Sequence, residues 1–169
     1  MRRALRSLTG LAWLLLVVAP PALVAAAEWA AVIPGTSTME TVRAQFGAPT
    51  RSATHRVEGY DSPSWTYEGA QAPGGVERLT VEFGLLTPAG YRPNVVRLLR
   101  LEPKPGVFDR QIVLNGWGEP QRIGKENEAP VYFYQQGLLV YFDRDGGKAR
   151  VLIFTPPQPS TDVPARRQP

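Results

Sequence analysis

The 169-residue chain contains no cysteine and a single histidine, His55. Without cysteine, the chain can form no disulfide, carry no thiol-linked lipid, use no cysteine nucleophile and bind no zinc or iron–sulfur cluster through thiolates. With one imidazole, a hydrolase that depends on a histidine base has a single candidate for that role. The short length limits the chain to one or two small domains.

Residues 1–27 predict a secretory signal peptide of bacterial type. The first six residues include three arginines, a short apolar stretch follows, and the segment ends on three alanines, which is the three-part layout of such a signal. The alternative is an uncleaved membrane anchor, which needs about 20 apolar residues and would have to include the proline pair at 20–21. We predict cleavage near Ala27, a periplasmic or secreted location, and no integral membrane span after cleavage.

The charge of the remaining chain is nearly balanced. The formal charge of +4 includes the three arginines of the signal, so residues 28–169 carry 16 basic and 15 acidic side chains. A balanced charge does not favour nucleic acid as a partner. We therefore expect no nucleic-acid binding.

The C-terminal residues 156–169 have the composition of an unfolded tail. They contain five prolines and almost nothing apolar to bury, which predicts a disordered or polyproline-like segment. The alternative is a proline-rich ligand for an aromatic groove of a partner protein.

The sequence at 34–49 recurs at 105–120 with a constant offset of 71 and no gap. The matching pairs are Pro34 and Pro105, Gly35 and Gly106, Val42 and Val113, Phe46 and Trp117, Gly47 and Gly118, and Pro49 and Pro120. Such a match of special residues indicates an internal repeat.

Each copy predicts a short helix. In the first copy, Ser37 and Glu40 fit a capping box at the helix start, and Gly47 fits a left-handed stop at its end. In the second copy, Asp109 fits the N-cap. The apolar faces would be formed by Met39, Val42 and Phe46 in the first helix and by Ile112, Val113 and Trp117 in the second.

Alternating residues and turn signals predict three strands after each helix. These strands are expected at 64–67, 79–83 and 95–101 in the first half, and at 131–134, 138–142 and 150–154 in the second. A unit of this size is marginal alone, so two copies are expected to share a core. The predicted fold class is α+β, with two tandem helix plus three-stranded antiparallel meander repeats at 28–103 and 104–155.

The first copy of the repeat, with the preceding Ile33, resembles the signature of the SmpA/OmlA (BamE-like) superfamily. The pattern is Ile-Pro-Gly, a Ser or Thr, a Val and a final Phe-Gly-x-Pro, after a secretory signal and before a strand meander. The two-copy layout is similar to the β-lactamase inhibitory protein fold. The resemblance implies a BamE-like fold and a role in binding other proteins of the cell envelope. That role would be in outer-membrane protein assembly or envelope maintenance. The resemblance also implies a peripheral association with the outer membrane.

No constellation of catalytic or metal-binding residues stands out in the sequence. His55 is expected on a loop or strand edge, and Glu126 and Glu128 are expected in a solvated loop. The segment 143–147 resembles the start of a calcium loop, but it lacks the distal glutamate, and a tight hairpin turn explains its residues. We predict no catalytic residue, no cofactor and no metal. An enzyme built on carboxylates is left open, with Glu58, Asp61 and Glu68 as candidates.

Aromatic residues are the remaining candidates for a binding site. Those expected on loops or on a partly open sheet face, where an interface could use them, are Trp29, Tyr60, Trp65, Tyr132, Tyr134 and Tyr141. The sequence therefore predicts an exported, non-enzymatic module that binds another protein of the envelope. The alternative function is a secreted inhibitor of a hydrolase such as a β-lactamase or a protease.

Overall fold

The computed structural model describes residues 26–157. The elements are the helices α1 (Met39–Phe46) and α2 (Arg110–Trp117), the short 3-10 helix η1 (Gly69–Gln71), and the strands β1 (Arg51–Val57), β2 (Tyr60–Glu68), β3 (Val76–Thr87), β4 (Gly90–Pro103), β5 (Arg122–Glu126), β6 (Ala129–Tyr134), β7 (Leu138–Phe142) and β8 (Ala149–Phe154). Residues 1–25 of the predicted signal peptide (1–27) and residues 158–169 of the predicted tail (156–169) lie outside the described residues.

All eight strands form one antiparallel sheet in the order β1-β2-β3-β4-β8-β7-β6-β5. The predicted α+β class with two helix plus three-stranded repeats is therefore wrong, because the described residues are mostly β-structure in one continuous sheet. The two unpredicted strands, β1 and β5, are the edges of the sheet. Nearly all of their residues are exposed, so they lack the alternation of buried and exposed side chains that identifies a strand in a sequence.

The two helices begin at side-chain caps and end at glycines with positive φ. The cap of α1 is Thr38, whose hydroxyl accepts a bond from the Thr41 amide. The expected cap Ser37 lies one residue earlier, where its hydroxyl accepts a hydrogen bond from the Ile33 amide at 2.9 Å. For α2, Asp109 is the cap as predicted, with Oδ1 2.8 Å from the Ile112 amide.

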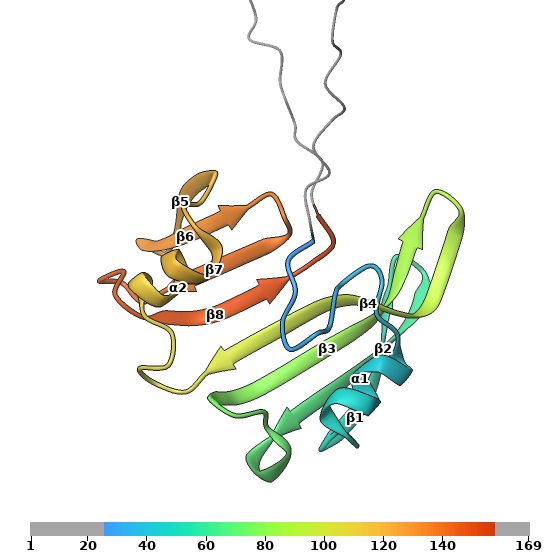
Figure 1. Cartoon of the computed structure of the whole chain (residues 1–169). Coiled ribbons are helices and arrows are strands. Elements are labelled where there is room, and N and C mark those ends of the chain that lie inside the picture. The colour runs from blue at the N-terminus through green and yellow to red at the C-terminus, as the bar shows by residue number, and fades with distance from the viewer. Residues whose placement is uncertain (1–25, 158–169) are drawn as a thin grey trace, which may run out of the picture.

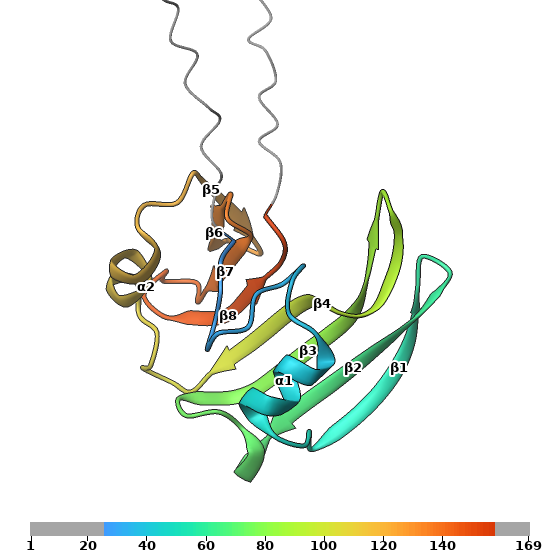
Figure 2. The ribbon, with the colours of Figure 1, turned by 45° about the vertical axis from the view of Figure 1, so that its right-hand side comes forward.

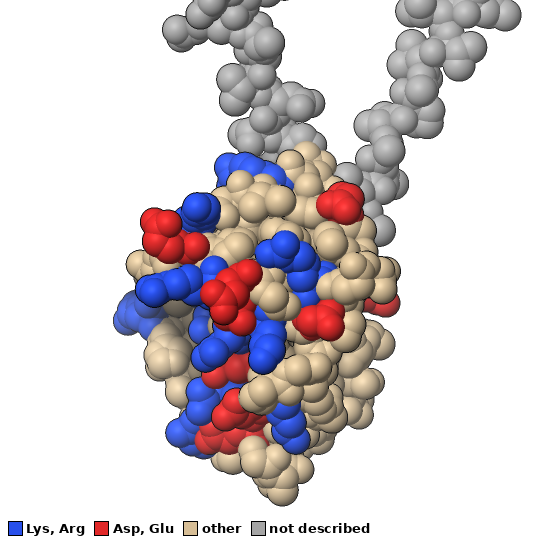
Figure 3. Space-filling view, turned by 90° about the vertical axis from the view of Figure 1, so that its left-hand side faces the viewer, with Lys and Arg blue, Asp and Glu red and all other residues tan. Residues whose placement is uncertain are grey.

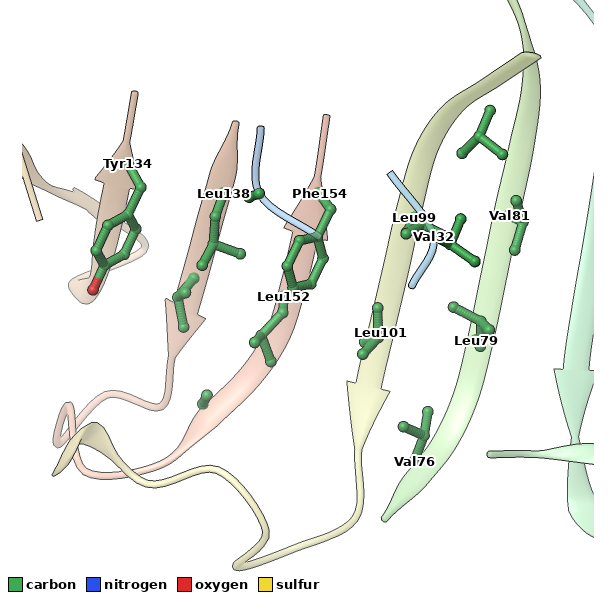
Figure 4. Close-up of a cluster of buried hydrophobic side chains, with 14 of the residues drawn as sticks. Val32, Val76, Leu79, Val81, Leu99, Leu101, Tyr134, Leu138, Leu152 and Phe154 are labelled. Atoms are coloured by element: carbon green, nitrogen blue, oxygen red, sulfur yellow. The ribbon is translucent and has the colours of Figure 1, made fainter. Parts of the chain in front are cut away.

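One face of the sheet carries the core. Both helices and the segment before α1 lie on this inner face, as Figures 1 and 2 show. Val42 of α1, Val113 of α2 and Val32 of the preceding segment are fully buried in one cluster with the inward side chains of the strands. Figure 4 shows these side chains on neighbouring strands pointing to the same side, with Val32 beside Leu99. Burial of one continuous apolar cluster joins the two halves of the sheet.

The two halves repeat the same order of elements, a helix followed by four strands, and they meet where β4 pairs with β8. Isolated bridges join each helix N-cap to its half of the sheet: Thr38 pairs with Val95 in β4, and Asp109 pairs with Lys148, the residue before β8. The resemblance to the SmpA/OmlA (BamE-like) superfamily and to the tandem inhibitor fold is nevertheless wrong, because the described residues form one continuous eight-stranded sheet with two short helices and not two helix plus three-stranded units. The Pro-Gly and Gly-x-Pro signature determines the ends of two helices, and it does not determine the sheet around them.

Residues 26–157 contain no helix that is long and apolar enough to cross a membrane. The division of the chain into units at 28–103 and 104–155 stays a prediction.

Candidate functional site

The face of the sheet opposite the helices is not covered by any helix of residues 26–157. One register row runs along this face through every strand. From β5 to β1 its members are Arg122, Phe133, Leu139, Ile153, Arg100, Thr80, Thr66 and Arg51. Apart from Arg122 at the β5 edge, the side chains of this row are apolar from β6 to β8 and polar from β4 to β1. The open face is thus divided into an apolar half and a polar half.

The polar half carries a chain of ion pairs across β1 to β4. Glu68 lies 3.0 Å from both Arg51 and Arg78, and Glu102 lies 3.1 Å from Arg78 and 3.3 Å from Arg100. The hydrogen bond that the Arg78 guanidinium donates to Glu68 is the largest cause that raises the pKa of Arg78. From the left-hand side of Figure 1, acidic and basic side chains are interleaved over the surface and form no patch of one sign (Figure 3). The charges on this half of the face are therefore neutralised by ion pairs within the chain.

The β3–β4 hairpin extends beyond the rest of the sheet and bends beside the tip of the β1–β2 hairpin (Figure 2). Register irregularities between Glu82 and Leu85 provide the bend. The two tips are joined by Tyr60 and Tyr91, whose rings stack with centroids 4.3 Å apart. The Tyr91 hydroxyl also donates a hydrogen bond to the Asp61 carbonyl oxygen at 2.5 Å. These contacts close one side of a pocket.

This hairpin pocket has a volume of about 250 Å³ and contains aliphatic, aromatic and charged side chains. Its lining is Val57, Glu58, Tyr60, Ser62, Gly84, Leu85, Leu86, Tyr91 and Arg97. The Arg97 guanidinium pairs with Glu82, while its buried Nε has no hydrogen-bond partner among the described residues. The pocket therefore combines an apolar wall with one polar corner.

Gly84 makes the close approach of Tyr91 possible. Its φ is +90°, and a Cβ at this position would overlap the Tyr91 hydroxyl oxygen. On the other side of the pocket, the buried Ser62 donates a hydrogen bond to the Phe83 carbonyl oxygen at 2.5 Å. The backbone around the pocket is thus fixed by specific contacts, and the pocket is pre-formed.

The six aromatic candidates lie in three environments, and the structure does not bring them together. Trp65, Tyr132 and Tyr134 are buried in the core. Trp29 is half-buried on the inner face and stacks on Phe46 of α1, with ring centroids 5.6 Å apart. Two candidates remain on the surface: Tyr60 in the hairpin pocket, and Tyr141 on the apolar half of the open face, where it pairs with Val131 and Val151.

Three residues of the hairpin pocket, Leu86, Tyr91 and Arg97, are absent from the sequence-based set of candidates. The signal that could have found them is Gly84, a glycine inside a strand that otherwise alternates. Such a glycine often marks a bulge or a close approach of another group.

Two of the residues considered for catalysis or metal binding, His55 and Asp143, lie in different halves of the sheet. His55 is an exposed residue of the edge strand β1. Asp143 accepts hydrogen bonds from the amides of Gly147 and Lys148, and the bond from Lys148 is the largest cause that lowers the pKa of Asp143. This carboxylate is thus used to form its hairpin turn. Within residues 26–157, no three acidic or histidine side chains gather in a group that could hold a metal ion.

Comparison with known proteins gives little information about function. No protein-family model matches the chain, and no curated protein matches it. Among solved structures, the chain is similar to the crystal structure of a DUF4309 family protein (YjgB) from Bacillus subtilis subsp. subtilis str. 168. The TM-score is 0.43 and the sequence identity is 14%, over 74% of this chain and 82% of that chain. A likeness of this degree says nothing about what this chain binds.

Proposed function

We propose that this chain is an exported, non-enzymatic module that binds another protein and anchors one of its apolar side chains in the hairpin pocket. One observation carries the proposal: Tyr60 and Leu86 line the same pocket, with 41% and 48% of their surfaces exposed. They are two of the four large hydrophobic side chains that are strongly exposed within the described chain. Exposed aromatic and aliphatic groups gathered in one pre-formed pocket are typical of the centre of a protein interface.

The size and chemistry of the pocket favour a protein side chain as the occupant. Its volume of about 250 Å³ lies below the roughly 300–1,000 Å³ of small-molecule and cofactor sites. The stacked rings of Tyr60 and Tyr91 offer a rigid surface that loses little conformational entropy on binding. The Arg97–Glu82 pair beside them offers polar groups to the backbone of a partner.

The expected location of the partner follows from residues 1–27. Their basic, apolar and small-residue parts support export, so the partner is expected among proteins outside the cytoplasm. Another protein of the cell envelope is the partner that we propose.

Site-specific photo-crosslinking in intact cells tests this proposal. A photoreactive residue in place of Tyr60 or Leu86 is expected to give one discrete protein adduct. The matched control is Ile112 on α2. Its exposed fraction of 42% is close to the 41% of Tyr60, and its helix lies on the inner face of the sheet. The yield of the adduct formed at Leu86 should fall when Tyr60 is replaced by alanine. Adducts at Ile112 alone, or none at either pocket position, would contradict the proposal.

A further inference from the structure

The apolar half of the open face forms a second surface, separate from the hairpin pocket. Two neighbouring register rows cross β6, β7 and β8 with apolar side chains only: Phe133, Leu139 and Ile153 in one row, and Val131, Tyr141 and Val151 in the other. We call these six residues the apolar strip. All of them except Val131 are half-buried, although no helix of the described chain covers this face. A contiguous apolar surface of this kind is typical of an interaction site.

Arginines border the apolar strip, and two of them have no acidic partner. The Arg122 guanidinium lies over the Phe133 ring, 4.3 Å from its centroid. Arg150 belongs to the bulge of β8, beside Val151. Within residues 26–157, neither Arg122 nor Arg150 has a carboxylate within ion-pair distance.

On the polar half of the same face, four arginines do have acidic partners. There Arg51, Arg78, Arg97 and Arg100 all pair with glutamates of the chain itself. The chain therefore neutralises these four arginines on one half of the face and leaves Arg122 and Arg150 without a carboxylate of the described residues at the border of the apolar strip. A partner that covers the strip has to supply the missing carboxylates, since burial of an unpaired charge is costly.

We propose that the apolar strip docks a segment of another protein that combines apolar and acidic side chains. The apolar groups would cover Phe133, Leu139 and Tyr141, and the carboxylates would pair with Arg122 and Arg150. A hollow of about 490 Å³ borders the strip at Arg150 and Val151. Its charged lining is mixed, with Arg100, Lys148 and Arg150 beside Glu77, Glu102 and Asp143, so the proposal rests on the strip and on its two border arginines, Arg122 and Arg150.

Two other occupants fit this charge pattern less well. A second copy of the chain docked strip to strip would bring its own Arg122 and Arg150 to the same border, and like charges would repel. The chain's own residues 158–169 contain two arginines and one acidic residue, Asp162, so they supply too few carboxylates. The charge pattern therefore favours a separate, acidic partner.

Selection from a displayed library of random short peptides tests the inference on the protein expressed from its full sequence and purified. Peptides that combine acidic and apolar residues are expected to be enriched. Their affinity should fall at least about tenfold in R122E/R150E, because the variant loses two charge-assisted hydrogen bonds to the peptide. The matched control is R56E/R92E, with the same change of charge on exposed arginines of the other half. Equal thermal unfolding of the two variants shows that both are folded.

Several outcomes would overturn the inference. These are enriched peptides without an excess of acidic residues, peptide binding that R122E/R150E leaves unchanged, or binding that only Tyr60→Ala abolishes. The last result would assign the peptides to the hairpin pocket and leave the proposed function intact. Binding to vesicles of phosphatidylglycerol and phosphatidylcholine that R122E/R150E abolishes would identify a lipid surface as the partner. Self-association of the purified protein that the same variant abolishes would identify a second copy.

Discussion

Tyr67 and Tyr134 occupy corresponding places in the two halves of the sheet. Each hydroxyl donates a hydrogen bond to the carbonyl oxygen of the glycine that ends the helix of its own half. The distances are 3.2 Å from Tyr67 to Gly47 and 3.1 Å from Tyr134 to Gly118. Both tyrosines are almost completely buried. The same contact therefore attaches each helix end to the second strand of its half.

Removing either hydroxyl should destabilise the fold by a similar amount. Tyr67→Phe and Tyr134→Phe each leave a helix-end carbonyl without this donor, and each should cost about 0.5–1.5 kcal/mol. Tyr141→Phe is the control, because no hydrogen bond of its hydroxyl occurs among the described residues. Urea unfolding of the three variants measures the difference. A cost for only one of the core tyrosines would show that the two contacts are not equivalent.

The buried tyrosines should also make the fold sensitive to alkali. Burial is the largest cause that raises the pKa of Tyr134 to about 12, and it raises the pKa of Tyr67 as well. In the unfolded chain these groups ionise near pH 10. The raised pKa therefore contributes fully to the free energy of unfolding below pH 10. This contribution is lost as the pH rises from about 10 to 12.

Thermal unfolding as a function of pH, together with the phenolate absorbance, measures this effect. We expect the unfolding temperature to fall between pH 10 and 12, and the phenolate absorbance to rise as Tyr67 and Tyr134 become accessible on unfolding and ionise. Tyr134→Phe should make the fall less steep. An unchanged slope in this variant would contradict the assignment to Tyr134.

The first residues of the fold lie at the predicted processing site. Ala27 is buried in the core cluster, and its amide donates to the Gln136 carbonyl oxygen at 2.7 Å. A chain that begins at Glu28 lacks both contacts. We expect it to be less stable than a chain that begins at Ala27, by about 0.5–1.5 kcal/mol for the hydrogen bond alone.

Unfolding of the two purified chains in urea measures this difference. Sequencing of the mature N-terminus from the host then shows which of them the cell makes. Equal stability of the two chains would show that Ala27 contributes nothing to the fold.

The sequence predicted the two helices and all six strands between the edge strands, because their apolar residues follow regular spacings. Val42, Val113 and Leu79 all lie in the core, as their spacing predicts. The edge strands β1 and β5 have no such pattern, because a strand at the edge of the sheet has few neighbours on either face. Their hairpin turns, with positive φ at Glu58 and Gly59 in one and at Asn127 and Glu128 in the other, show the geometry of tight two-residue loops.

The binding candidates were predicted less well than the fold elements. An aromatic residue looks the same in a sequence whether its face of the strand is covered or open, so the buried Trp65 and the exposed Tyr60 could not be distinguished. The contact of Tyr60 with Tyr91 joins two hairpins through a bend that register irregularities create. No local spacing encodes such a bend.

Gly84 connects the stability of the fold to the hairpin pocket. In Gly84→Ala the new Cβ would overlap the Tyr91 hydroxyl oxygen, and the residue would keep a positive φ. We expect the variant to lose about 1–2 kcal/mol from backbone strain and about 1–3 kcal/mol more from the overlap. The displaced Tyr91 should also open the pocket and reduce crosslinking at Leu86.

Gly59→Ala separates these two effects. Gly59 has nearly the same φ, +84° against +90°, but nothing lies within 4 Å of the position of its Cβ. This control should lose only the stability that backbone strain costs, and it should still crosslink at Leu86. Urea unfolding and photo-crosslinking of both variants measure the two effects. Equal losses in the two variants would mean that Tyr91 moves aside freely, and that the contact between the hairpin tips does not hold the pocket in shape.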